Sequence, residues 1–477
     1  MLFTEKLSHL LKNSSAEGVE MKRDAINFEN EKIPVLFRKI LIPTLLGTIS
    51  MSAVTAIDGI FVGHGAGAEG VAAVNIIAPI FMIMSGIGLM VGSGCSVVAS
   101  IHLSKQKNRV ARLNITQAIV CSSAGTALLC ALSLISPEQT ARLLGASDTL
   151  MPQVVGYLKW IMPSFIFQIW STTGLFIIRL DGSPRCAMWC NITPALLNGV
   201  LDWLFIFPLG MGVVGAAIAT AISYLVGGIM ALTYLLFFAS SLRLIPLKMS
   251  WKSMLLSLRN MRYQCKIGSS ALFGEMTLAV LILVGNLVFM TYLGDAGVGA
   301  YGIVCYYAPF FFMVGNAIAQ SAQPIISYNY GLARTKEMQE ARKLLLATSI
   351  IIGMFVSSLF ITVPDFLVAL FVDPHTESGQ LAIQGFPYFA TGIIFFILNV
   401  AITGYYQSVE RIKRATLFVF LRGFILLIPC FFLLPQLLGV KGIWLAMPLA
   451  EFTTTLLIII LYSSYMQKIK RMLAGSR

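Results

Sequence analysis

The feature that most constrains this chain is a series of twelve apolar segments, each near or above the length that crosses a membrane. A helix needs about 20 apolar residues to span the hydrocarbon layer. The segments are 34–62, 70–101, 113–136, 151–178, 186–208, 212–240, 265–293, 297–328, 341–364, 382–407, 415–436 and 439–466. The chain is 57% hydrophobic and only 12% charged, whereas soluble proteins are roughly 45–50% apolar and about 25% charged. The sequence therefore predicts an all-α polytopic membrane protein with twelve transmembrane helices.

The positions of Lys and Arg predict the orientation of these segments. Thirty of the 34 lie in the two terminal regions and in alternate connections, which face the same side if there are twelve helices. The other side has only Arg142, Lys159 and Lys441, and Arg422 falls inside a segment. Because cytoplasmic loops are enriched in Lys and Arg, we expect a multi-pass membrane protein with both termini cytoplasmic. The net charge of +13 follows from this topology, and we expect no nucleic acid partner.

The two halves of the sequence resemble each other. The stretch GAGAEGVAAVNIIAP (65–79) aligns with DAGVGAYGIVCYYAP (295–309). Each unit has six helices, so both enter the membrane in the same direction, and a parallel repeat of this kind places a substrate site between two bundles. We expect a cytoplasmic tail over 1–33, an N-lobe over 34–240, a cytoplasmic linker over 241–264, a C-lobe over 265–466 and a cytoplasmic tail over 467–477. Met21 is an alternative start.

Two aspartates within the apolar segments are the first candidates for function, because intramembrane acids are costly and rare. Asp58 lies in segment 34–62, fifteen residues after Pro43, which can kink that helix. Asp202 lies in segment 186–208, and Asn198 is four residues earlier, on the same helical face. Thr220 of the next segment can offer a hydroxyl to the same cluster. Such a cluster can bind and release H⁺, or hold Na⁺ at Asp58 and Asp202; the alternative is that the two acids lie near helix ends and are simply hydrated.

Glu275, in the first third of segment 265–293, is a candidate for a substrate or ion site in the second half. Its alternative role is to pair with Arg422, although Glu451 is the partner that we expect for this arginine. The aromatic and Met content suits a pocket for flat, apolar cations; packing and lipid contact are the alternative roles for any one such residue. The eight cysteines and four histidines show no metal-ligand or redox spacing, and no catalytic constellation is present, so we expect neither a metal site, nor a cofactor, nor an enzyme.

These features together resemble the multidrug and toxin extrusion (MATE) transporters, and within them the bacterial MepA-like branch. The resemblance covers residues 34–466. It rests on the two six-helix repeats and on the order and spacing of four motifs: DGIFVGHGAGAEGVAAV, GVVGAAIATAIS, FGEMTL and QPIISYNYGLARTKEMQEA.

The resemblance implies export of cationic, amphipathic drugs by antiport with H⁺ or Na⁺, as two lobes rock around a central cavity. It implies that Asp58, Asn198, Asp202 and Thr220 couple transport to the ion, that Pro43 kinks the first helix and that Glu275 matches the family's acid on the seventh. The NorM-like branch has an aspartate on the tenth helix, whereas this helix has no acid and only polar residues such as Asn399. The cluster in the first half is therefore the better candidate for coupling.

A lipid-linked saccharide flippase of the related superfamily is the alternative function. Such a flippase lines its cavity with cations that hold pyrophosphate, whereas acids dominate here. We expect a monomer whose partners are small-molecule drugs and membrane lipids. The sequence does not distinguish H⁺ from Na⁺ and does not identify the physiological substrate.

Overall fold

A computed structural model describes residue 26, residues 28–247 and residues 250–474. The N-terminal tail up to residue 25, with the alternative start Met21, and the last three residues lie outside the described part, as do the side chains beyond Leu461. The predictions for the two tails therefore fall largely on residues that the structure does not describe.

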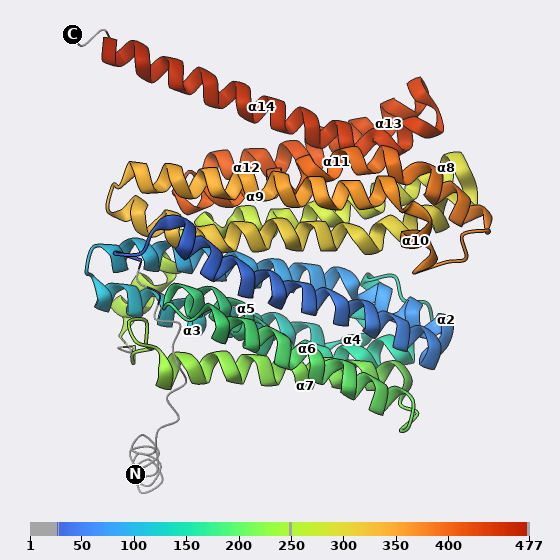
Figure 1. Ribbon diagram of the computed structural model, residues 1–477. Coiled ribbons are helices and arrows are strands. Elements are labelled where there is room, and N and C mark those ends of the chain that lie inside the picture. Colours follow the sequence, from blue (N-terminus) through green and yellow to red (C-terminus); the bar gives the residue numbers. More distant parts are fainter. Residues whose placement is uncertain (1–25, 27, 248–249, 475–477) are drawn as a thin grey trace, which may run out of the picture.

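The described residues form helices and contain no β-strand (Figure 1). The first half consists of α2 (Ile33–Ser104), α3 (Asn108–Ile135), α4 (Pro137–Leu143), α5 (Met151–Leu180), α6 (Pro184–Ile206), α7 (Gly212–Thr233) and the π-helical turn η1 (Tyr234–Phe238). The second half consists of α8 (Trp251–Gly331), α9 (Thr335–Thr362), α10 (Pro364–Ala369), α11 (Glu377–Ser408), α12 (Ile412–Phe420), the π-helical turn η2 (Leu421–Ile425), α13 (Leu427–Leu438) and α14 (Val440–Ala474). A helix pairs its backbone N–H and C=O groups internally, as a lipid environment requires.

The two longest helices, α2 and α8, are each divided by a glycine. Gly67 has φ 69° and Gly294 has φ 60°, conformations that residues with a Cβ rarely adopt. Ten stretches of the described residues are long and apolar enough to cross a membrane. One of these ten stretches is α8, which Gly294 divides into two helices, so the ten stretches contain eleven helices. The twelfth is α6, which has 23 residues. The structure thus confirms the predicted all-α fold of twelve helices.

The helices pack into two bundles, which Figure 1 shows one above the other. The first bundle comprises α2 to α7, whose buried residues form two hydrophobic cores. The second bundle comprises α8 to α14, which share one large core. The first turns of α2 cross to the second core through Leu36 and Ile40, and the first turns of α8 reach a first-bundle core through Met261 and Cys265. The leading helix of each half therefore contacts both bundles.

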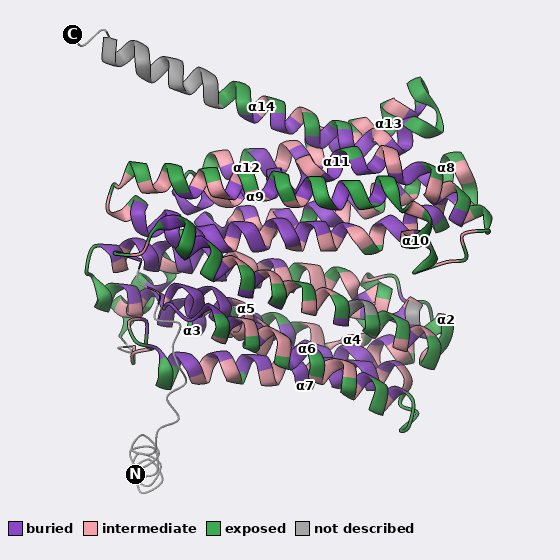
Figure 2. Ribbon diagram, viewed as in Figure 1, coloured by how far each residue is buried: buried purple, intermediate pink, exposed green. Residues whose placement is uncertain are grey.

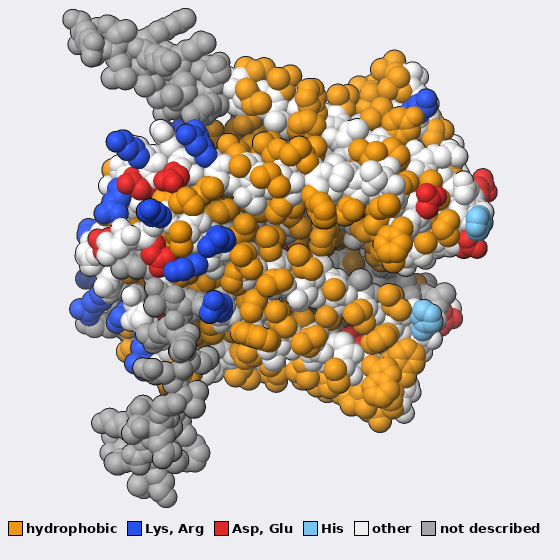
Figure 3. Space-filling model, in the orientation of Figure 1, with side chains coloured by type: hydrophobic (Ala, Val, Ile, Leu, Met, Phe, Trp, Pro, Cys, Tyr) orange, Lys and Arg blue, Asp and Glu red, His pale blue; other side chains and the backbone are white. Residues whose placement is uncertain are grey.

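The surface has the pattern of a protein that crosses a membrane. Buried residues follow the inside of each bundle (Figure 2), while outer positions expose apolar side chains such as Leu283 and Phe355. On the face drawn in Figure 3, hydrophobic side chains occupy a broad middle belt, and Lys and Arg gather at the left end. We call this the basic end; it is the end predicted to face the cytoplasm.

Glycines bring the backbones of the two bundles into direct contact. A methyl group added to Gly94 of α2 would overlap the carbonyl oxygen of Gln264 on α8, and one added to Gly268 would overlap the carbonyl oxygen of Met90. Only residues without a Cβ allow two helices to approach this closely. Glycine at positions 94 and 268 therefore determines how closely α2 and α8 approach each other.

We expect Gly268→Ala to destabilise the protein by about 1–3 kcal/mol, because the added methyl group must push the bundles apart. Gly302→Ala, on the same helix, is the matched control, since a Cβ at Gly302 meets nothing within 4 Å. Thermal unfolding of both variants in detergent measures the difference. Equal melting temperatures for the two variants would contradict the proposed role of the glycine contact.

Candidate functional site

The structure brings Asp58 and Asp202 together from α2 and α6. Their carboxyl groups are close enough to share a hydrogen bond. Asp202 is fully buried, at 0% exposure, and Asp58 is half-buried. Neither Asp202 oxygen accepts a hydrogen bond from a donor among the described residues, and the same holds for Asp58 Oδ1. Two carboxylates in such contact repel each other when both are ionised, and a proton or a cation bound between them would relieve this repulsion.

Asp58, Asn198 and Thr220 line one cavity of about 260 Å³ beside this pair. Asn198 Nδ2 donates to Thr220 Oγ1 at 3.5 Å. All four residues of the predicted coupling cluster therefore lie at one place inside the first bundle. Asp202 lies four residues before the last residue of α6, but it is enclosed by protein, which argues against the alternative that it is simply hydrated there.

Two tyrosines belong to this cavity and were not predicted. Tyr224 follows Thr220 by four residues on α7, and Tyr157 of α5 is within hydrogen-bonding reach of Thr220. The spacing from Thr220 was a usable signal for Tyr224, because residues i and i+4 share a helical face. No pattern in the sequence singles out Tyr157, whose place depends on how α5 packs.

Pro43 lies in the first part of α2, where the helix runs on without interruption. The only non-helical dihedral angles within α2 are those of Gly67. Proline leaves a backbone carbonyl without its helical partner, and Thr44 Oγ1 donates to another carbonyl in this turn, that of Ile40, at 2.8 Å. A kink at Pro43 during transport stays a prediction.

Glu275 lies between the bundles and apart from Arg422. It is on α8, and Ser85 of α2 donates to its Oε1 at 3.4 Å. The two residues line a central cavity of about 170 Å³, together with polar and aromatic residues that include Gln168, Asn191 and Phe312. Glu275 is thus accessible from the space where a parallel repeat is expected to bind its substrate.

The central cavity and the cavity of the aspartate pair adjoin. Four residues line both of them: Met51, Pro194, Ser223 and Tyr224. A change in the arrangement of one cavity therefore moves part of the wall of the other.

The predicted pair of Arg422 and Glu451 is confirmed. Arg422 Nη2 lies 2.6 Å from Glu451 Oε1, with side chains 1% and 3% exposed. Asn399 Nδ2 donates to Glu451 Oε2 at 2.7 Å, Thr455 Oγ1 donates to Asn399 Oδ1 at 2.9 Å, and the guanidinium lies over Phe396. This network engages both oxygens of Glu451, so it leaves no free carboxylate for a coupling ion.

Arg179 is placed differently from what the sequence indicated. We counted it among the basic residues of a connection, but it lies in the last turn of α5, is 3% exposed and lines the central cavity. The error arose because the end of a helix is hard to locate within one turn from sequence.

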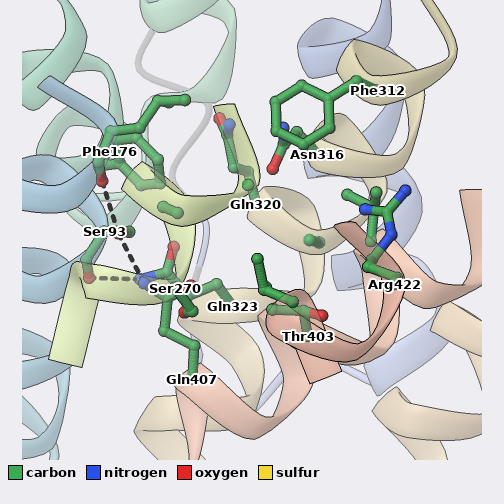
Figure 4. Close-up of a pocket in the computed structure, with 17 residues that line it drawn as sticks. Ser93, Phe176, Ser270, Phe312, Asn316, Gln320, Gln323, Thr403, Gln407 and Arg422 are labelled. Atoms are coloured by element: carbon green, nitrogen blue, oxygen red, sulfur yellow. Dashed lines mark hydrogen bonds between the residues drawn. The ribbon is translucent and has the colours of Figure 1, made fainter. Parts of the chain in front are cut away.

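A smaller cavity of about 40 Å³ continues from the central one (Figure 4). Here Gln323 Nε2 donates to the backbone oxygen of Ser93 at 2.9 Å, and Gln407 Nε2 donates to Ser93 Oγ at 2.7 Å. Ser93 adjoins the glycine contact at Gly94, and both glutamines come from the second bundle. Close backbone contact and these hydrogen bonds together hold the two bundles against each other around Ser93 and Gly94.

Comparison with known proteins identifies relatives over almost the whole chain. The family model MatE matches residues 43–204 and 271–433, one block in each half. The multidrug export protein MepA of Staphylococcus saprophyticus is 24% identical over 424 residues, covering 86% of this chain and 89% of that protein. MepA of Staphylococcus aureus is 24% identical over 435 residues, covering 88% of this chain and 92% of that protein.

Solved structures show the same fold. The outward-facing conformation of a multidrug resistance MATE family transporter of the MOP superfamily superposes with a TM-score of 0.85 at 17% identity, covering 93% of this chain and 98% of that one. A MOP superfamily transporter from Pyrococcus furiosus, described as having a binding pocket of reversed polarity, gives 0.84 at 17% identity with the same coverage.

We expect Glu451→Ala to destabilise the protein by about 3–5 kcal/mol, because it leaves the buried Arg422 charge without a partner. The double variant Arg422→Met, Glu451→Leu is expected to recover most of this loss, since apolar residues of similar volume often replace a buried pair at little cost. Thermal unfolding in detergent is the measurement. A double variant as unstable as Glu451→Ala would show that the unpaired Arg422 charge is not the cause of the loss.

Proposed function

Since the chain belongs to the MatE family of transporters, we propose that it exports amphipathic organic cations and related drugs by antiport against an inward flow of H⁺ or Na⁺. The observation that carries this proposal is the enclosed pair of Asp58 and Asp202, which has no other partner among the described residues. The named relatives are multidrug export proteins, which supports drugs as the cargo.

The aspartate pair is suited to bind a cation reversibly. A net negative charge in a low-dielectric interior costs several kcal/mol, so a proton or Na⁺ that enters the cavity is held between the two carboxyls. The hydroxyls and amide around it supply neutral oxygens, which either ion accepts. When the cavity opens to the other side and fills with water, the charged pair is hydrated and the ion can leave.

The two adjoining cavities give a route from ion binding to cargo release. Binding of the ion draws Asp58 and Asp202 together and so fixes α2 against α6. Met51 of α2 and Pro194 of α6 form part of the central cavity wall, so the shape of that cavity depends on the ion. Alternating access follows if this change is linked to exchange of the contacts around Ser93 and Gly268.

A lipid-linked saccharide flippase is less consistent with the central cavity. Pyrophosphate carries several negative charges and needs several cations, whereas the described residues of this cavity include Arg179 as a cation and Glu275 as an acid. We also propose that the protein lies in a bacterial cytoplasmic membrane with both termini cytoplasmic. One chain contains both bundles and both cavities, so we propose that a monomer is sufficient for transport.

Asp202→Asn is expected to reduce export of ethidium from cells to the rate of cells without the protein. Asparagine keeps the size of the side chain but cannot take up a proton or balance Na⁺. Asp148→Asn is the matched control, because Asp148 is an exposed acid that pairs with Arg142 at the surface. Normal ethidium export by Asp202→Asn at equal expression would refute its coupling role.

In proteoliposomes, one of two gradients imposed alone, of protons or of Na⁺, is expected to drive dye transport. The same gradient should have no effect on vesicles with Asp202→Asn, because the ion site is then lost. Fluorescent dye accumulation after each gradient is imposed measures the response. If neither gradient accelerates transport by the wild-type protein, the antiport proposal fails.

A further inference from the structure

Arg179 is a buried cation with few partners. Its Nη2 donates to Gln320 Oε1 at 2.6 Å, and its guanidinium lies 5.0 Å from the ring centroid of Phe176. A guanidinium has five N–H donors, and Gln320 accepts from only one of the two Nη groups. The described residues place no carboxylate within ion-pair distance of Arg179.

Arg422, which lines the smaller cavity, is in contrast a buried cation with a carboxylate partner. Arg422 has two hydrogen bonds from Nε and one from Nη2 to the Glu451 carboxylate. Buried charges in proteins are normally paired in this way. The C-terminal end of α5 offers Arg179 partial negative charge from backbone carbonyls, which makes the buried cation tolerable but leaves most of its donors available.

The position of Arg179 directs these donors into the central cavity. It lines that cavity together with Glu275, and Phe176, Phe312 and Gln320 are also among the lining residues. In Figure 4, Phe176 and Gln320, the two side chains in contact with Arg179, lie along one side of the smaller cavity, with Phe312 beyond them. The central cavity therefore offers a cation, an acid and aromatic surfaces to one occupant.

We propose that Arg179 is an anion-binding subsite of the central cavity, which holds the carboxylate of aromatic zwitterionic substrates while Glu275 faces their cationic group. This inference rests on the proposed drug export function. A guanidinium binds a carboxylate through two parallel hydrogen bonds, a geometry that a lysine ammonium does not reproduce. The carboxylate competes with Gln320 for Arg179, so such a substrate also loosens a contact between the bundles.

The test compares two dyes that differ only in the negative charge. A rhodamine with a free benzoate and its methyl ester share the same cationic aromatic ring system. Initial transport rates of both are measured in proteoliposomes driven by the effective ion gradient. Arg179→Gln is expected to lower the ratio of acid to ester rates about tenfold, the loss typical of a charged hydrogen bond. Arg179→Lys should give a ratio between those of Arg179→Gln and the wild type.

Gln320→Leu is the matched control, because it removes the acceptor across the bundle interface and keeps the guanidinium. Its acid-to-ester ratio should equal or exceed that of the wild type, because the guanidinium is retained and loses the acceptor that competes with the carboxylate. Binding of each dye to the purified variants, measured by fluorescence anisotropy, gives the same ratio independently of transport.

An unchanged ratio in both Arg179→Gln and Arg179→Lys would overturn the subsite. Equal losses for both dyes in Arg179→Gln and in Gln320→Leu would also overturn it, because Arg179 would then serve only as a contact between the bundles. Failure of the wild-type protein to transport either dye under either gradient would refute the proposed function itself, which distinguishes the two failures.

Discussion

The rest of this structure depends on the absence of water in the membrane interior, where every polar group needs a partner in the protein. The backbone meets this demand by forming helices, and most buried side chains meet it as well. In the network of Arg422, Glu451, Asn399 and Thr455, the guanidinium is paired with a carboxylate and both Glu451 oxygens accept hydrogen bonds. Against that background Asp58, Asp202 and Arg179 differ, because they are charged and incompletely paired among the described residues. A membrane protein tolerates such residues where an ion or a ligand completes them.

The proposed alternating access requires the two bundles to separate. The three largest hydrophobic cores lie mainly within one bundle, with contributions from the leading turns of α2 and α8, while a small cluster of Val97, Val98 and Ile101 with Ile267 joins the bundles. Between them, glycines allow close backbone contact, and hydrogen bonds such as those to Ser93 hold them at one level. These contacts exchange readily for water when the interface opens. The leading turns of α2 and α8 touch both bundles and are therefore the natural hinges.

The sequence was sufficient to predict the fold and that Asp58, Asn198, Asp202 and Thr220 form one cluster, but it did not predict the distances between them; the coupling role of the cluster stays a prediction. Asn198 and Asp202 share a helical face by their spacing, and an acid such as Asp58 within an apolar segment is conspicuous on its own. Contact between Asp58 and Asp202 depends on how α2 packs against α6, which helical periodicity does not determine. The same limit applies to Tyr157 and to the contact of Glu275 with Ser85, since each partner comes from a different helix. Arg179 was assigned to a connection although it lies in the last turn of α5, because the sequence does not locate the end of a helix to within one turn.

For the proposed antiport, the arrangement of charges favours coupling through the shape of the cavities, since ion and drug would bind at different sites. The acid pair lies inside the first bundle, whereas Glu275 and Arg179 face the space between the bundles. A bound drug in the central cavity need not touch Asp202 to influence it, because Ser223 and Tyr224 of α7 belong to both walls. The opposite charges of Glu275 and Arg179 also leave the central cavity close to neutral, so it can accept a cation or a zwitterion. In the proposed antiport, ion binding would change the charge of a different cavity, and the two events would be linked because the two cavities share the same helices.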